Sequence, residues 1–270
     1  MSNADIAFAG SIPRLYQQYM VPMIFEPYAA DLGQRVAALP VREVLEVAAG
    51  TGVVTRTLAS VFPDSVSIVA TDLNQPMLDL AAAIGTARPV QWLQADAMQL
   101  PFDDGAFDLV VCQFGVMFFP DKPKAFSEAR RVLRPGGLFI FNVWDRIEEN
   151  AFADTITAAL ASLFPDDPPR FMARVPHGYH DFVTIEQDLK AGGFSEAPTF
   201  STVTARSQAA SPRIPALALC QGTPVHSEIE ARDKSMLDAA TDIAEQAMTF
   251  RFGSGPVDGK IQAHVVAVKC

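Results

Sequence analysis

Short apolar runs alternate with amphipathic stretches over the first 145 residues of the chain. Five runs are strand-length and rich in β-branched and aromatic residues: 43–48, 67–72, 90–95, 107–113 and 137–144. Such runs are typical of strands that are covered on both faces. Between them, apolar residues recur every three or four positions over 53–61, 75–83 and 122–133, which predicts helices. The alternation indicates a parallel sheet with crossover helices.

The second half of the chain has a less regular pattern. Its periodicity predicts helices over 150–164 and 185–191 and one long helix over 227–251. Strand-like alternation or β-branched residues occupy 200–205 and 261–268. We therefore expect an α/β fold with five parallel strands, then a lid-like insertion, then two closing strands.

Composition narrows the class of protein. Hydrophobic residues make up 49% of the chain and charged residues 19%, which is typical of a folded globular protein. The three cysteines are odd in number and lack CxxC spacing, which favours reduced thiols and a cytoplasmic location over disulfides or a zinc site. The N-terminal residues lack the segments of a signal peptide, and no apolar run is long enough for a membrane span.

The net charge is −10, and the basic residues are scattered along the chain. Nucleic acids and anionic membranes bind clustered basic residues, so neither is an expected partner. The expected partner is a small molecule. The sequence leaves a homodimer open.

The most informative stretch joins the first predicted strand to the helix after it. The strand contains the acid Glu46, and Gly50 and Gly52 follow in the turn. Glycines here permit a tight turn and let a ligand approach without a Cβ in the way. A single Gly-x-Gly is weak evidence by itself, because many strand-helix turns contain one.

Acidic residues at the ends of the next two strands strengthen the pattern. Asp72 ends the second strand, where a carboxylate accepts hydrogen bonds from ribose hydroxyls in doubly wound folds. The alternative is that Asp72 caps the next helix, a role for which Asn74 competes. After the third strand, Asp96 is suited to accept from an adenine amino group. The fourth strand ends at Gln113, and all these strand ends would meet at one edge of the sheet.

These motifs, together with Phe107-Asp108-Leu109 and Arg134-Pro135-Gly136-Gly137, resemble the class I S-adenosylmethionine (SAM)-dependent methyltransferases. The chain is most similar to the ubiquinone/menaquinone-biosynthesis-type enzymes. The resemblance implies a doubly wound, mostly parallel, seven-stranded Rossmann-like sheet with an antiparallel last strand and a helical lid insertion. It also implies SAM as cofactor and a methyl acceptor that is a small metabolite. The expected parts are an N-terminal helical cap (1–40), a SAM-binding core (41–145), a lid and acceptor region (146–198) and closing strands with a helical insertion (199–270).

The resemblance also assigns roles to residues. Glu46, Gly50 and Gly52 would form the SAM loop and Asp72 would hold the ribose hydroxyls. The remaining cofactor contacts would come from Leu73 or Met77 against the adenine ring, Asp96 and Ala97 at the adenine edge, and Gln113 near the methionine part.

Two further cofactor positions are less regular. The family often has glycine where this chain has Ala48, and an alanine fits there if its φ is negative. In the aromatic N-terminal stretch, Tyr19 is our candidate for a contact with SAM. The alternative is that tyrosines and phenylalanines of this stretch pack against the core.

The candidates for a general base are His180, in the predicted lid, and Asp145, just past the fifth strand. A lid rich in phenylalanine favours an apolar or aromatic acceptor. Two alternative functions stay open: a SAM-binding subunit without catalysis, and a nicotinamide-dependent oxidoreductase. The sequence argues against the second, because Thr55 stands where the third glycine of Gly-x-Gly-x-x-Gly would be.

Overall fold

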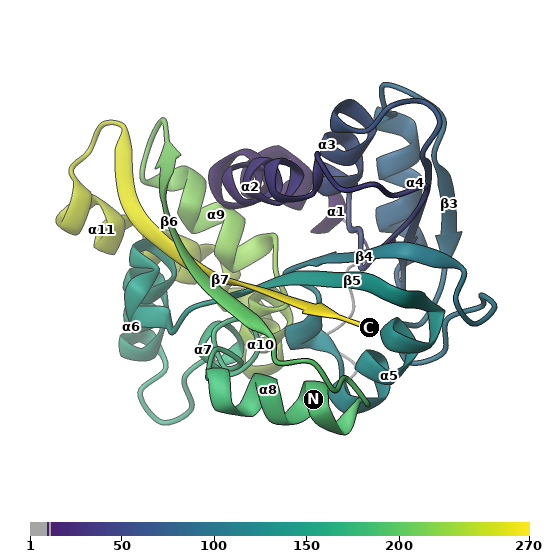
Figure 1. Ribbon diagram of the computed structural model, residues 1–270. Coiled ribbons are helices and arrows are strands. Elements are labelled where there is room, and N and C mark those ends of the chain that lie inside the picture. Colours follow the sequence, from purple (N-terminus) through teal and green to yellow (C-terminus); the bar gives the residue numbers. More distant parts are fainter. Residues whose placement is uncertain (1–9, 11) are drawn as a thin grey trace. The chain divides into compact units, whose positions relative to one another are not determined.

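A computed structural model describes residue 10 and residues 12–270, so the N-terminal residues considered for a signal peptide lie outside it. Its strands form a seven-stranded sheet in the order β3-β2-β1-β4-β5-β7-β6 (Figure 1). The strands are β1 (Glu43–Val47), β2 (Ser67–Asp72), β3 (Gln91–Gln94), β4 (Phe107–Gln113), β5 (Leu133–Trp144), β6 (Thr199–Ala209) and β7 (Val257–Lys269). Strands β1 to β5 pair in parallel, as expected.

The last strand runs antiparallel to β5, which confirms the expected fold class. Gly136 N–H donates to the Cys270 carbonyl at 2.8 Å, near the start of β5 and just beyond the end of β7. Just beyond the other end of β5, Asp145 N–H donates to the carbonyl of Gln262 at 3.1 Å. Residue numbers therefore rise along β5 as they fall along β7.

The chain forms two compact units. The sheet unit comprises residues 26–143, 179–203 and 263–270, and the helical unit comprises the residues up to 25, 144–178 and 204–262. Helices of the sheet unit are α2 (Glu26–Val36), α3 (Val53–Val61), α4 (Gln75–Ile84), η3 (Val116–Phe118), α5 (Lys122–Val132) and α8 (Phe182–Ala191). Helices of the helical unit are α1 (Ile12–Leu15), η2 (Tyr16–Phe25), η4 (Ile147–Glu149), α6 (Ala151–Leu163), α7 (Phe171–Arg174), α9 (Arg213–Gln221), α10 (Val225–Arg232), η5 (Lys234–Met236) and α11 (Leu237–Phe252).

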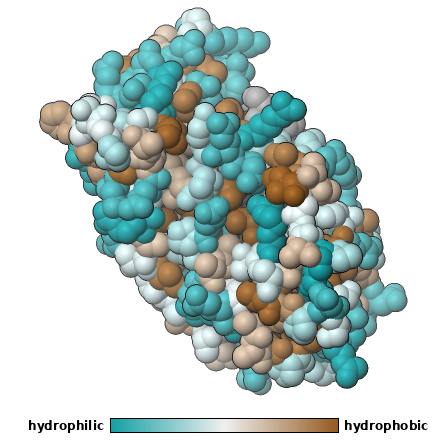
Figure 2. All heavy atoms as spheres, turned by 90° about the horizontal axis from the view of Figure 1, so that it is seen from above, coloured by the Kyte–Doolittle hydropathy of each residue, from teal (hydrophilic) through white to brown (hydrophobic). Residues whose placement is uncertain are grey.

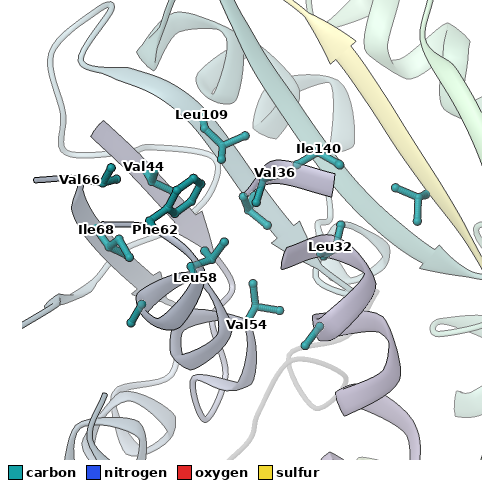
Figure 3. Close-up of a cluster of buried hydrophobic side chains, with 14 residues drawn as sticks. Leu32, Val36, Val44, Val54, Leu58, Phe62, Val66, Ile68, Leu109 and Ile140 are labelled. Atoms are coloured by element: carbon teal, nitrogen blue, oxygen red, sulfur yellow. The ribbon is translucent and has the colours of Figure 1, made fainter. Parts of the chain in front are cut away.

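A hydrophobic cluster in the sheet unit holds α2 and α3 against one face of the sheet (Figure 3). Leu32 of α2 and Leu58 of α3 are fully buried with Val44 and Leu109 of the sheet. Burial of one such side chain stabilises the fold by about 1.5–3 kcal/mol. The cluster therefore fixes the start of α3, and with it the turn that connects β1 to α3.

The prediction of one continuous helix over 227–251 was wrong. The backbone is extended at Asp233, with φ −157° and ψ 115°, and this residue separates α10 from η5 and α11. The Asp233 carboxylate accepts from Ser235 N–H at 2.8 Å, a local bond that competes with helical hydrogen bonding. Helix α9 was not predicted. It begins after Pro212, and Pro215 lies in its first turn, where proline is tolerated.

In the part of the chain that the structure describes, no helix is long and apolar enough to cross a membrane. On the face drawn in Figure 2, hydrophilic and hydrophobic residues are interspersed.

Candidate cofactor and active site

The turn between β1 and α3 depends on its two glycines. Gly50 and Gly52 have φ of 57° and 81°, in the left-handed region that favours glycine. A Cβ on Gly52 would also lie 2.8 Å from the ring of Trp92. The hydroxyl oxygen of Thr51 is buried in this turn and has no hydrogen-bond partner among the described residues. A bound polar ligand would give it one, so the turn fits a cofactor such as SAM.

Ala48 differs from expectation, because its φ is +56° and not negative. The backbone of this turn therefore keeps the left-handed conformation that glycine would adopt easily, and the alanine carries the strain.

Glu46 is 1% exposed, and its side chain points to α3. The Thr55 hydroxyl donates to Glu46 Oε2 at 2.5 Å. Burial raises the pKa of Glu46 to about 8, and the nearby carboxylate of Asp72 acts in the same direction, while Thr55 and Arg56 oppose it. Thr55 could not be predicted as a partner of Glu46, since the contact depends on how α3 packs on β1.

Asp72 joins the ends of β1 and β2. Its Oδ2 accepts from Gly50 N–H at 2.8 Å and its Oδ1 accepts from Asn74 N–H at 2.8 Å. Burial raises the pKa of Asp72. The N-cap of α4 is Asn74, so Asp72 does not have the capping role that was its alternative. Its position beside the glycine turn suits a ribose-binding carboxylate.

The candidate adenine contacts differ in exposure. Leu73 is 44% exposed directly after Asp72, whereas Met77, in the first turn of α4, is buried. Asp96 Oδ1 accepts from Met98 N–H at 2.8 Å, which orders the turn after β3. Ala97, in the same turn, lines a small apolar cavity with residues of β1, β4, β5 and α5.

Gln113 ends β4 beside Asn142 of β5. Side chains alternate between the faces of a strand, so Glu46, Gln113 and Asn142 point to the same face as the cluster around α2 and α3. Three polar side chains thus lie in a row near the carboxyl ends of neighbouring strands. Asn142 was not among the predicted site residues, because its strand has an otherwise apolar pattern.

Tyr19 lies in η2 of the helical unit and is partly exposed. In the same element Tyr16 stacks on Phe25 with ring centroids 5.0 Å apart, which is the packing alternative for those two residues. Phe25 in turn lies 6.1 Å from Trp144, and Trp144 lies 6.0 Å from the ring of His177. The helical unit therefore contains a row of four aromatic rings.

Asp145 is buried at the end of this row. Its Oδ2 accepts from the Gln262 side chain at 2.6 Å and its Oδ1 from Arg146 N–H at 2.7 Å. The histidine that contacts Asp145 is His177, whose Nδ1 lies 2.8 Å from the Asp145 carbonyl oxygen. Because a carbonyl only accepts, this contact requires a proton on Nδ1, and in a neutral ring the lone pair would then lie on Nε2.

His180, the predicted alternative base, is partly exposed in the sheet unit next to Asp181. His177 was not among the predicted site residues. Only the fold reveals that its ring is buried against Trp144 and bonded to the backbone of Asp145.

The family model described as a methyltransferase domain matches residues 45–141. The ubiquinone/menaquinone biosynthesis C-methyltransferase UbiE of Ectopseudomonas mendocina (strain ymp) is 41% identical over 178 residues, covering 61% of this chain and 69% of the relative. UbiE of Stutzerimonas stutzeri is 29% identical over 199 residues, covering 69% and 73%. The demethylmenaquinone methyltransferase of Thermus thermophilus is 39% identical over 121 residues, covering 42% and 54%.

Solved structures share the fold at low identity. Phosphoethanolamine N-methyltransferase 2 of Haemonchus contortus, in complex with SAM, has a TM-score of 0.56 at 17% identity and covers 96% of this chain and 56% of its own. The [4+2]-cyclase SpnF has a TM-score of 0.55 at 21% identity, covering 90% and 80%. At these identities the likeness shows the fold alone.

Proposed function

Because the chain belongs to the class I SAM-dependent methyltransferases, with SAM as its cofactor, we propose that it methylates a small, apolar molecule with a hydroxylated aromatic ring. The observation that carries the proposal is the aromatic row of the helical unit, which ends at the buried Asp145 and His177. Two relatives are named for ubiquinone/menaquinone biosynthesis and a third for demethylmenaquinone methylation, and these names support the same class of acceptor.

The SAM site is proposed at the carboxyl ends of β1 to β4. SAM, when bound, supplies a methyl group on a sulfonium, which an electron-rich atom attacks in line. Asp72 would hold the ribose hydroxyls and Asp96 the adenine edge, with Leu73 against the adenine ring. The Gly50 to Gly52 turn would let the ligand approach the backbone. Much of the catalysis would then come from positioning.

The acceptor site is proposed in the helical unit. The buried rings of Trp144 and Phe25 would form an apolar wall beside which an aromatic acceptor would bind. A phenolic ring reacts faster once its hydroxyl has lost a proton, so a base is useful. The Nε2 lone pair of His177 suits that role, with Asp145 as the residue whose carbonyl orients the ring. His180 and the Asp145 carboxylate stay alternative bases.

The test uses the full chain with methyl-labelled SAM and four acceptors: a prenylated hydroquinone, a catechol, phosphoethanolamine and a peptide. Labelled hydroquinone or catechol is the expected product. Labelling of phosphoethanolamine or the peptide alone would overturn the proposed acceptor class.

Matched variants assign the base. His177→Gln should lower kcat by about 100-fold and flatten its rise with pH, the usual magnitude for a general base. His180→Gln is the matched control and should leave kcat within about threefold. If His180→Gln lowers kcat strongly and His177→Gln does not, His180 is the base. If only Asp145→Asn lowers kcat strongly, the base is the Asp145 carboxylate.

A further inference from the structure

Two turns at one edge of the sheet hold strained residues. Among the described residues, Ala48 and Phe114 are the non-glycine residues with positive φ, 56° and 53°. Ala48 directly follows β1 and Phe114 directly follows β4, and these strands are parallel neighbours. Left-handed backbone is unfavourable for a residue with a Cβ, so contacts around each turn must hold it in place.

Phe114 is held by its neighbours on β5 and α2. Its N–H lies 3.1 Å from the backbone oxygen and 3.2 Å from Oδ1 of Asn142. Its ring meets the buried ring of Tyr28 edge-on, with centroids 5.2 Å apart. The turn after β4 is therefore fixed from two sides.

Gly115, the next residue, is required for a different reason. Its φ is −96°, which any residue adopts, so its conformation does not demand glycine. A Cβ at this position would lie 2.5 Å from the Cβ of Ala48 and 2.6 Å from Sγ of Cys112. Both distances are far inside van der Waals contact, so the methyl group of Ala48 occupies the space that Gly115 leaves.

We propose that Ala48 and Gly115 form a steric pair that positions the SAM-binding turn. The inference rests on the proposed role of residues 48–52 in holding SAM. Directly after Ala48, Ala49 N–H donates to the Thr71 carbonyl at 2.9 Å and Gly50 N–H to Asp72 Oδ2 at 2.8 Å. A larger residue at 115 would push Ala48 away from β4, towards β2, and so distort these two hydrogen bonds at the end of β2. SAM affinity therefore depends on the two residues jointly.

The experiment is a double-mutant cycle in a C112A background, which removes the second obstacle to a Cβ at 115. Calorimetry measures the Kd for SAM of C112A, C112A/G115A, C112A/A48G and C112A/A48G/G115A. We expect C112A/G115A to bind SAM roughly tenfold more weakly than C112A, the size of a modest overpacking cost. The triple variant should recover to within about threefold of C112A/A48G.

A matched control separates positioning from general destabilisation. Val66, buried in the hydrophobic cluster before β2, lies away from both turns. C112A/V66A should melt at a lower temperature and keep the SAM affinity of C112A. The pair is refuted if C112A/G115A binds SAM as well as C112A, or if A48G fails to restore binding.

Failure of the proposed SAM turn gives a different result. In that case C112A itself binds no SAM, while the melting temperatures of the four proteins still test the pair. G115A should lower the melting temperature and A48G should restore it. If C112A/G115A does not fold, recovery of folded protein on adding A48G supports the pair, and lack of recovery refutes it.

Discussion

Glu46→Gln is expected to change how the stability of the protein depends on pH. The carboxyl group of Glu46 is 1% exposed and receives a hydrogen bond from Thr55 at 2.5 Å. Burial raises its pKa from 4.5 to about 8. Glutamine keeps the size of the side chain and an oxygen that can accept from Thr55, but it has no proton to lose.

The sign follows from which state holds the proton. Between pH 4.5 and about 8 the folded protein keeps the Glu46 proton, while the unfolded chain has released it. Stability therefore falls as pH rises through this window and levels off above it. Each pH unit costs about 1.4 kcal/mol, so the whole window costs roughly 5 kcal/mol.

The assay is urea unfolding from pH 5 to pH 9 without SAM, for the wild type and Glu46→Gln. Across this range the unfolding free energy of the wild type should fall by roughly 4 kcal/mol relative to that of Glu46→Gln. Glu43→Gln makes the same change at the other end of β1, where the side chain is half-buried, and is the matched control. Parallel pH profiles for the wild type and Glu46→Gln would refute the reasoning.

Three further substitutions test other parts of the sheet unit. Asp72→Asn should weaken SAM binding by roughly 30-fold in calorimetry, because hydrogen bonds to a charged group contribute about 1.5–3 kcal/mol. Gly52→Ala should lower the unfolding free energy by at least about 1 kcal/mol in urea, since φ is 81° and Trp92 stands in the way. Glu128→Gln should cost about 1–2 kcal/mol at neutral pH by thermal denaturation, because it breaks the ion pair between the buried Glu128 and the partly exposed Arg131. Arg131 lowers the pKa of Glu128, so this cost should shrink as pH falls through that pKa.

The parallel half of the fold was predictable because its strands are covered on both faces. Strands β2 and β4 begin and end where their apolar runs do. The helical unit was less predictable, because the hydrophobic period over 227–251 does not reveal the local hydrogen bond that interrupts the helix. The carboxylate of Asp233 accepts a hydrogen bond from Ser235 N–H, directly after α10 ends. Side-chain capping of this kind competes with helix continuation and leaves the hydrophobic period unchanged.

The positions of the candidate cofactor residues could be predicted because parallel strands end at a common edge. Their partners could not, since each comes from a different element. Thr55 contacts Glu46 through the packing of α3, and His177 contacts Asp145 within the helical unit. Such contacts leave no periodic or spacing signal along the chain.

Ala48 shows why a departure from a motif has to be judged together with its spatial partner. On the local rule, alanine in place of glycine requires a negative φ, yet the residue is left-handed. The strain persists because the turn is bonded to Thr71 and Asp72 on β2 and because Gly115 leaves room for the methyl group. Gly115 itself has an ordinary backbone, so nothing in its own neighbourhood of the sequence demands glycine. The two positions thus explain each other, and a change at one is expected to be tolerated only with a change at the other.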